Sequence, residues 1–124
     1  MKIRILNNHL RFRLKQLEVE RFMQEGRVIE VLEFGQETAA QLSFCLEIYQ
    51  EESLSVRFIS NVTTIFVPQG IAESWTSSER VGFDGKINTG LGRTIEILVE
   101  KDFQCLDGRE EENEGSYPNP KISQ

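Results

Sequence analysis

The chain contains two copies of one pattern, and this repetition constrains its fold more than any other feature. The segment Thr63–Trp75 passes from a β-rich run through Pro68 into an amphipathic helical pattern. At a constant offset of 53 residues, and without a gap, Leu10–Phe22 has the same strand-into-helix outline. Proline suits the first helical position, where its missing N–H costs no hydrogen bond. The sequence therefore predicts a tandem repeat, with one copy in residues 2–49 and the other in residues 54–101.

The two copies agree more in which positions are apolar and face inward than in the number of identical residues. Seven pairs are identical at this offset, among them Arg27/Arg80 and Val28/Val81. The apolar pairs carry more weight, because a strand shifted by one residue would turn all of its side chains to the other face. The alternative is that two β-rich halves agree through patterning alone. The apolar pairs that keep the inward phase are Ile3/Val56, Ile5/Phe58, Phe12/Ile65, Leu14/Val67, Val19/Ala72, Phe22/Trp75, Leu42/Ile95, Phe44/Ile97 and Leu46/Val99.

Each copy is predicted to form two strands, a short helix and two further strands. Alternating apolar residues and turn residues such as Asn7-Asn8 and Ser60-Asn61 indicate the hairpins. The glycine-rich stretch Asp84–Gly92 is predicted to be a loop. One such unit cannot close its own sheet, whereas two can bury a shared core and cover each other's edges. We expect an α+β, mostly β fold: a small pseudo-twofold barrel or sandwich with two short helices. The predicted segments are strands 2–5, 10–14, 27–34, 41–49, 54–60, 63–67, 80–83 and 94–101, and helices 15–25 and 68–77.

Composition places most of the acidity in the last part of the chain. The net charge is −6 over 124 residues, and residues 102–124 hold six acidic and two basic side chains. We therefore expect a single domain over residues 1–101, followed by an acidic, largely irregular tail that Phe103 and Tyr117 could anchor. The remainder is nearly neutral, which argues against a protein that coats nucleic acid non-specifically. No run approaches the roughly 18 apolar residues of a membrane span. With Cys45 and Cys105 expected as free thiols, we expect a cytoplasmic protein without membrane association.

Two resemblances add to this interpretation. The segment Thr64–Trp75 resembles the core of AbrB-type and antitoxin-type DNA-binding domains, in which a strand ends in Ile-Pro and a helix follows directly. This resemblance implies a swapped-hairpin fold with both halves of such a dimer in one chain, although Gly70 replaces the usual acidic residue. Nearly the whole chain also resembles small bacterial proteins of unknown function, which open with Met-Lys-Ile-Arg-Ile and close with the pattern of Glu100–Leu106. The second resemblance implies no biochemical activity.

The first hairpin is the best candidate for a binding surface. With Asn7-Asn8 as the turn, Arg4 lies opposite Arg11 and Lys2 lies opposite Arg13, all on the outward face. Like charges directly across a ladder are destabilising, so we expect a negative group over them. That group could be a phosphate, a nucleic-acid backbone or the protein's own carboxylates. The candidate carboxylates are Glu30, Glu33 or other nearby acids, and the tail residues Glu110, Glu111, Glu112 and Glu114.

The second hairpin carries apolar side chains at the corresponding positions. Val62, Thr64 and Phe66 are predicted either to belong to the core or to form a contact surface for a protein partner or a second copy of the chain.

No pattern of residues indicates catalysis, a metal or a cofactor. The single histidine, His9, lies near a turn without an adjacent partner motif, and Cys105 has no Cys-x-x-Cys companion for a zinc site. Cys45 is expected to be a small buried hydrophobe. The Asp84–Gly92 stretch lacks the Gly-Lys-Ser/Thr ending and the following helix of a phosphate-binding loop. We therefore expect a non-enzymatic binding or interaction module of unknown partner. The alternative is an AbrB-like nucleic-acid-binding regulator that uses the cationic hairpin.

Overall fold

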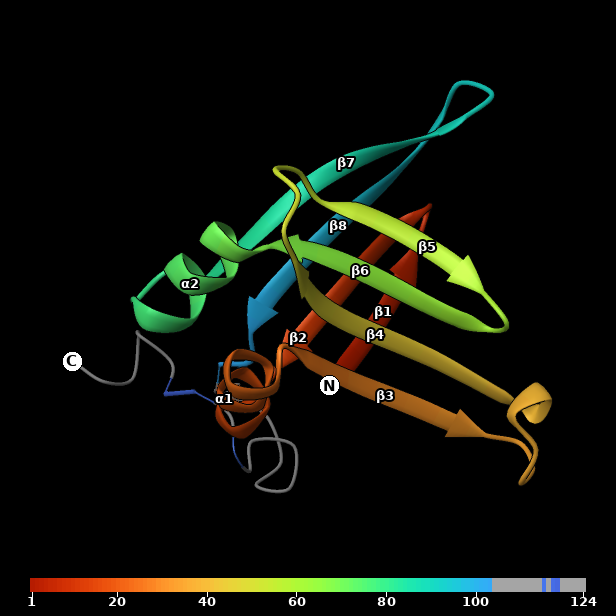
Figure 1. Cartoon of the computed structure of the whole chain (residues 1–124), viewed down its shortest axis with the longest axis horizontal. Coiled ribbons are helices and arrows are strands. Elements are labelled where there is room, and N and C mark those ends of the chain that lie inside the picture. Colours follow the sequence, from red (N-terminus) through yellow and green to blue (C-terminus); the bar gives the residue numbers. More distant parts are fainter. Residues whose placement is uncertain (104–114, 116, 119–124) are drawn as a thin grey trace.

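The structure is a computed structural model, and it describes residues 1–103, 115, 117 and 118. The described chain forms eight strands, two α-helices and one short 3-10 helix (Figure 1). No helix among the described residues has the length and apolar character needed to span a membrane. The elements are β1 (Lys2–Leu6), β2 (His9–Leu14), α1 (Gln16–Glu25), β3 (Arg27–Glu33), the 3-10 helix Thr38–Ala40, β4 (Gln41–Tyr49), β5 (Ser55–Ile59), β6 (Val62–Pro68), α2 (Gln69–Ser77), β7 (Gly82–Gly90) and β8 (Arg93–Lys101).

The strands form two four-stranded mixed sheets, and each sheet takes one hairpin from each repeat. Sheet A has the order β1-β2-β8-β7, and sheet B has the order β3-β4-β6-β5. The hairpins are antiparallel, and the two repeats meet in parallel pairs, β2 with β8 and β4 with β6. Each repeat therefore contributes half of both sheets, and neither repeat could form this fold alone.

The two repeats are equivalent residue by residue over much of their length. The pair Lys2 and Arg13 in the β1–β2 ladder corresponds to Ser55 and Phe66 in the β5–β6 ladder. The contact between repeats is equivalent too, since His9 opposite Glu96 in sheet A corresponds to Val62 opposite Ser43 in sheet B. The predicted two-repeat ββαββ architecture is confirmed.

The core lies between the facing sheets and is closed at one end by the helices. The rings of Phe12 in sheet A and Phe44 in sheet B meet edge to face, with centroids 6.1 Å apart. At the helical end, Phe22 of α1 meets Trp75 of α2, and the Trp75 ring also packs on Phe83 of β7. Away from the helices the two sheets diverge (Figure 1). The molecule is a sandwich whose sheets are not joined into a barrel.

Local sequence explains the turns that fix these hairpins. Both predicted turns are present and adopt left-handed backbone conformations, with φ values of 50° and 63° at Asn7 and Asn8 and of 52° and 64° at Ser60 and Asn61. Gly26 follows α1 with a φ of 76° and donates its N–H to the carbonyl oxygen of Phe22, which ends the helix.

The prediction of a loop at Asp84–Gly92 is wrong. These residues continue β7, and only Leu91 and Gly92 form the turn to β8. A glycine suits position 85 of this strand because Leu54 lies directly over it. A Cβ at Gly85 would come 2.8 Å from the Leu54 Cδ1 atom. The glycine thus marks a close approach of the β4–β5 connection to sheet A.

The repeat correspondence also shifts at this point. Val28 lies opposite Leu46, and its structural equivalent is Phe83 opposite Val99. The identical pairs Arg27/Arg80 and Val28/Val81 are therefore not equivalent positions. The segment between α2 and β7 is longer than the one between α1 and β3, and the shorter β7–β8 turn restores the common offset.

Beyond β8 the chain stays attached to the core for a short distance. Phe103 and Tyr117, the two residues predicted to anchor the tail, form an isolated parallel bridge, and their ring centroids are 5.7 Å apart. The predicted role of Glu110, Glu111, Glu112 and Glu114 concerns positions outside the described residues.

Candidate functional site

The outward face of sheet A carries most of the candidate residues, and we call it the charged face. The ladder registers place its side chains in three rows that cross all four strands. The rows, in the strand order β1-β2-β8-β7, are Lys2, Arg13, Glu100, Gly82; then Arg4, Arg11, Leu98, Asp84; then Leu6, His9, Glu96, Lys86. Both predicted oppositions of like charge, Lys2 with Arg13 and Arg4 with Arg11, are present.

Three of the four predicted cations have carboxylate partners within the protein. The Lys2 Nζ atom lies 2.9 Å from Asp102 Oδ2, and Arg13 Nε lies 3.7 Å from Asp102 Oδ1. Asp102 follows β8 directly and is almost fully buried. Arg11 Nε donates a hydrogen bond of 2.5 Å to Glu100 Oε1. Asp102 and Glu100 are thus the nearby acids that pair with these cations, whereas Glu30 contacts the amino group of Met1.

Two charged side chains of the middle row remain without an ion pair among the described residues. They are Arg4 on β1 and Asp84 on β7, at opposite edges of the sheet. The remaining charges of the face are paired, because Glu96 Oε2 lies 2.6 Å from His9 Nε2 and Glu96 Oε1 lies 3.2 Å from Lys86 Nζ. Arg4 and Asp84 are thus the charged groups most readily offered to a ligand.

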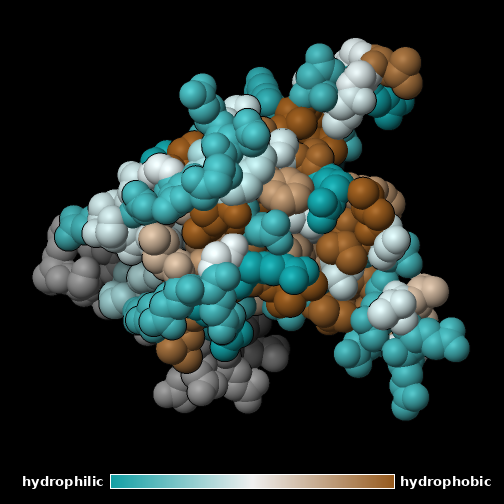
Figure 2. All heavy atoms as spheres, viewed as in Figure 1, coloured by the Kyte–Doolittle hydropathy of each residue, from teal (hydrophilic) through white to brown (hydrophobic). Residues whose placement is uncertain are grey.

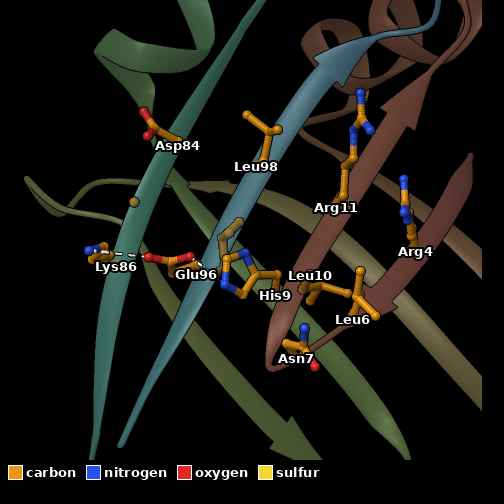
Figure 3. A pocket seen from close by; sticks show the side chains of 12 residues that line it. Arg4, Leu6, Asn7, His9, Leu10, Arg11, Asp84, Lys86, Glu96 and Leu98 are labelled. Atoms are coloured by element: carbon orange, nitrogen blue, oxygen red, sulfur yellow. Dashed lines mark ion pairs between the residues drawn. The ribbon is translucent and has the colours of Figure 1, made fainter.

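These residues surround a hollow in the charged face. It has a volume of about 400 Å³, and all four strands of sheet A line it. Figure 3 shows Asp84, Leu98, Arg11 and Arg4 in that order across it, with the Glu96 ion pairs to one side. The lining residues are Arg4, Leu6, Asn7, His9, Leu10, Arg11, Asp84, Gly85, Lys86, Glu96, Ile97 and Leu98.

The equivalent face of sheet B has a different character. Its rows, in the order β5-β6-β4-β3, are Ser55, Phe66, Glu47, Arg27; then Arg57, Thr64, Cys45, Ile29; then Ile59, Val62, Ser43, Val31. Apolar or small residues thus stand where sheet A has Asp84, Lys86, Glu96 and His9. The two sheets have the same backbone pattern but different surface chemistry.

The predicted contact residues Val62, Thr64 and Phe66 lie together on this sheet B face. Thr64 is only 2% exposed, so its neighbours cover it. Phe66 is half-buried, stacked on Tyr49 at 5.2 Å and covered by the Arg57 guanidinium at 5.0 Å. The exposed apolar side chains of the face are Ile29, Val31 and Ile59, which the sequence analysis did not identify.

The described residues contain no group of three or more histidine, cysteine or acidic side chains placed to hold a metal ion. Cys45 is buried, and its Sγ atom accepts a hydrogen bond of 3.1 Å from Arg27 Nε. Cys105 lies outside the part of the chain that the structure describes.

Sequence reasoning found the cationic half of the hollow and missed the other half. Lys2, Arg4, Arg11 and Arg13 were correctly placed together on one outward face. The loop prediction for Asp84–Gly92 omits the residues of β7, and the residues of β8 reach the hollow only through the parallel pairing of β2 with β8, which has no local signal. A signal was present, since Phe83 and Ile87 are apolar and point inward while Asp84 and Lys86 alternate with them, which is typical of a half-buried strand.

Comparison with known proteins identifies a family but no activity. A family model described as "Family of unknown function (DUF7009)" matches residues 1–121. No curated protein matches the chain, and no solved structure matches it.

Proposed function

The chain belongs to this family of unknown function, and from its own residues we propose that it is a binding module that holds a small anionic ligand in the hollow of the charged face. One observation carries the proposal. Arg4, alone among the four cations of the first hairpin, has no ion pair among the described residues, and it lies directly opposite a second arginine at the hollow.

The opposition of Arg4 and Arg11 explains why an anion would bind there. Two like charges across a ladder repel each other, and Glu100 engages Arg11 through Nε only. A carboxylate or phosphate between the two guanidinium groups would accept charge-assisted hydrogen bonds and relieve the repulsion. Binding would thus stabilise the folded protein.

The charge balance of the face favours a small anion over nucleic acid. Lys2, Arg4, Arg11, Arg13 and Lys86 give five positive charges, and Asp84, Glu96, Glu100 and Asp102 give four negative charges. Nucleic-acid binding draws on several basic contacts to successive phosphates. Here most of the basic side chains already have carboxylate partners, so the AbrB-like alternative has less support.

Our proposal is of binding without catalysis. The imidazole at the hollow, His9, lies 2.6 Å from Glu96, and no serine, threonine or cysteine is among the lining residues. The hollow therefore offers charged groups for recognition but no hydroxyl or thiol nucleophile of its own.

Thermal unfolding in acetate and in phosphate, at ionic strength held constant against chloride, tests the proposal. A ligand at ten times its Kd adds about 1.4 kcal/mol of stability, which is a rise of a few degrees in Tm for a domain of this size. We expect this rise for the wild type and its loss in Arg4→Ala. Arg57→Ala is the matched control, because Arg57 occupies the equivalent position on sheet B. Equal shifts in all three proteins would refute a site at Arg4.

Binding to a 20-base-pair DNA duplex in the same buffers distinguishes the proposed anion site from the alternative, a nucleic-acid-binding regulator. Fluorescence anisotropy at low salt should show no binding that depends on Arg4, Arg11 or Arg13. Tight binding that weakens steeply with salt, and that Arg11→Glu abolishes, would instead support the nucleic-acid-binding regulator.

A further inference from the structure

We infer that the ligand of the hollow is an elongated zwitterion, namely a short peptide with free termini, whose carboxylate binds Arg4 and whose ammonium group binds Asp84. This assignment rests on the proposed function and specifies its ligand. It follows from Asp84, the second charge of the middle row that has no ion pair among the described residues, which a simple anion would not contact.

The two charges without an ion pair among the described residues have opposite sign and lie at opposite ends of one row. Arg4 opposes Arg11, Arg11 opposes Leu98, and Leu98 opposes Asp84. Arg4 and Asp84 stand on the two edge strands, so the row crosses the full width of the sheet. A molecule with one charge of each sign at its two ends would pair both groups at once.

The spacing of the strands gives an approximate length for the ligand. Neighbouring strands are about 4.8 Å apart, so three steps separate the Arg4 and Asp84 backbones by about 14 Å. An extended peptide covers about 3.3 to 3.6 Å per residue, so three or four residues bridge this distance. The volume of about 400 Å³ lies at the lower end of the range for small-molecule sites, which also suits a ligand of this size.

The centre of the row suits an apolar side chain of the peptide. Leu98 is partly exposed between Arg11 and Asp84 (Figure 3). Beside it, Glu96 is held by His9 and Lys86, so it does not compete with Asp84 for the ammonium group. The row therefore offers a cationic end, an apolar middle and an anionic end, in the order of a peptide's carboxylate, side chain and amino group.

Isothermal titration calorimetry with Ala-Leu-Ala and its two capped forms tests the assignment. For the wild type, N-acetylation and C-amidation should each weaken binding about 10-fold, as the loss of one charge-assisted contact. In Arg4→Ala, amidation should matter much less than in the wild type, since only Arg11 remains at that end, while acetylation keeps its full effect. In Asp84→Ala, acetylation should no longer matter while amidation still does. Arg57→Ala should behave like the wild type, and circular dichroism checks that each variant is folded.

Two further measurements test the peptide assignment separately from the proposed anion site. If 8-aminooctanoate binds as tightly as the tripeptide, the peptide assignment is wrong and only the zwitterion remains. If acetate stabilises the protein through Arg4 but the tripeptide binds no more tightly than acetate, the anion site is supported and the zwitterionic ligand is refuted. If capping has the same effect in the wild type and in both variants, the proposed contacts are refuted.

Discussion

Asp102 explains how a hairpin with four cations on one face can be stable. Its buried carboxylate lies between Lys2 and Arg13, which the β1–β2 register places opposite each other. The backbone holds Asp102 in place, since its N–H donates to the Leu14 carbonyl oxygen and its own carbonyl oxygen accepts from the Tyr117 N–H. The first residue after β8 therefore neutralises cations at the start of β1 and near the end of β2.

Replacing Asp102 with Asn should destabilise the protein by about 2 to 4 kcal/mol, because it leaves two opposed cations without their buried partner. Glu100→Gln is the comparison, since Glu100 is more exposed and pairs with Arg11 alone; we expect a loss of 1 kcal/mol or less. Urea unfolding measures both variants. A loss for Asp102→Asn no larger than for Glu100→Gln would show that this carboxylate has no special role.

Lys101 gives a pH dependence with a definite sign. Burial lowers the pKa of its ammonium group below the usual 10.5, an effect that Glu79 partly opposes, and Nζ donates a hydrogen bond of 2.7 Å to the Ser78 carbonyl oxygen. Between the lowered pKa and 10.5 the unfolded chain binds more protons than the folded one, so stability rises with pH in this window. The free energy of unfolding of the wild type should therefore rise relative to Lys101→Met as the pH approaches 10.5. A constant difference between the two proteins would contradict this.

At the scale of elements, the hairpin turns determine the ladder registers. Ser60 and Asn61 both adopt left-handed backbone conformations, which cost a serine more than an asparagine or a glycine. Ser60→Gly should therefore stabilise the protein by about 0.5 to 1 kcal/mol, as measured by urea unfolding. The same change at Ser55, which lies in the regular strand β5, should destabilise it. If Ser60→Gly is also destabilising, the turn is not as constrained as its φ values indicate.

Local pattern predicted the elements well where side chains alternate and turns have typical residues. The β1–β2 and β5–β6 hairpins follow from Asn7-Asn8 and Ser60-Asn61, and the helices follow from their apolar spacing. Strand β7 was missed because glycines at positions 82, 85 and 90 weaken its pattern. At Gly85 the cause is long-range, because a Cβ there would come within 2.8 Å of Leu54, which directly precedes β5.

The candidate site was predictable only in part, for the same reason. The hairpin register gave the opposed arginines, whereas the parallel pairing of β2 with β8 joins positions almost 90 residues apart and has no local signal. Without that pairing, neither the Arg11–Glu100 ion pair nor the row from Arg4 to Asp84 can be inferred.

At the scale of the molecule, the core is closed at the helical end and open at the other. Ile5, Leu32 and Phe58 have the inward phase but are 65%, 55% and 65% exposed, because the sheets diverge there. Figure 2 shows apolar surface in this half of the molecule. A closed barrel would have buried these side chains.

Substitutions in the two halves should therefore differ in cost. Phe58→Ser should destabilise the protein by about 1 kcal/mol or less, whereas Phe12→Ala in the closed half should cost about 3 to 5 kcal/mol. Chemical denaturation measures both. A loss of several kcal/mol for Phe58→Ser would indicate that the open end is in fact packed.

The equivalence of the two sheets makes the central claim testable within one molecule: the charged face of sheet A binds the ligand, and its counterpart on sheet B does not. The direct measurement is a map of backbone amide shifts in the ¹⁵N-labelled full chain during titration with Ala-Leu-Ala. We expect the largest changes at Arg4, Arg11, Leu98 and Asp84, and negligible changes at the equivalent positions Arg57, Thr64, Cys45 and Ile29. Equal changes on both faces, or changes confined to sheet B, would contradict the account.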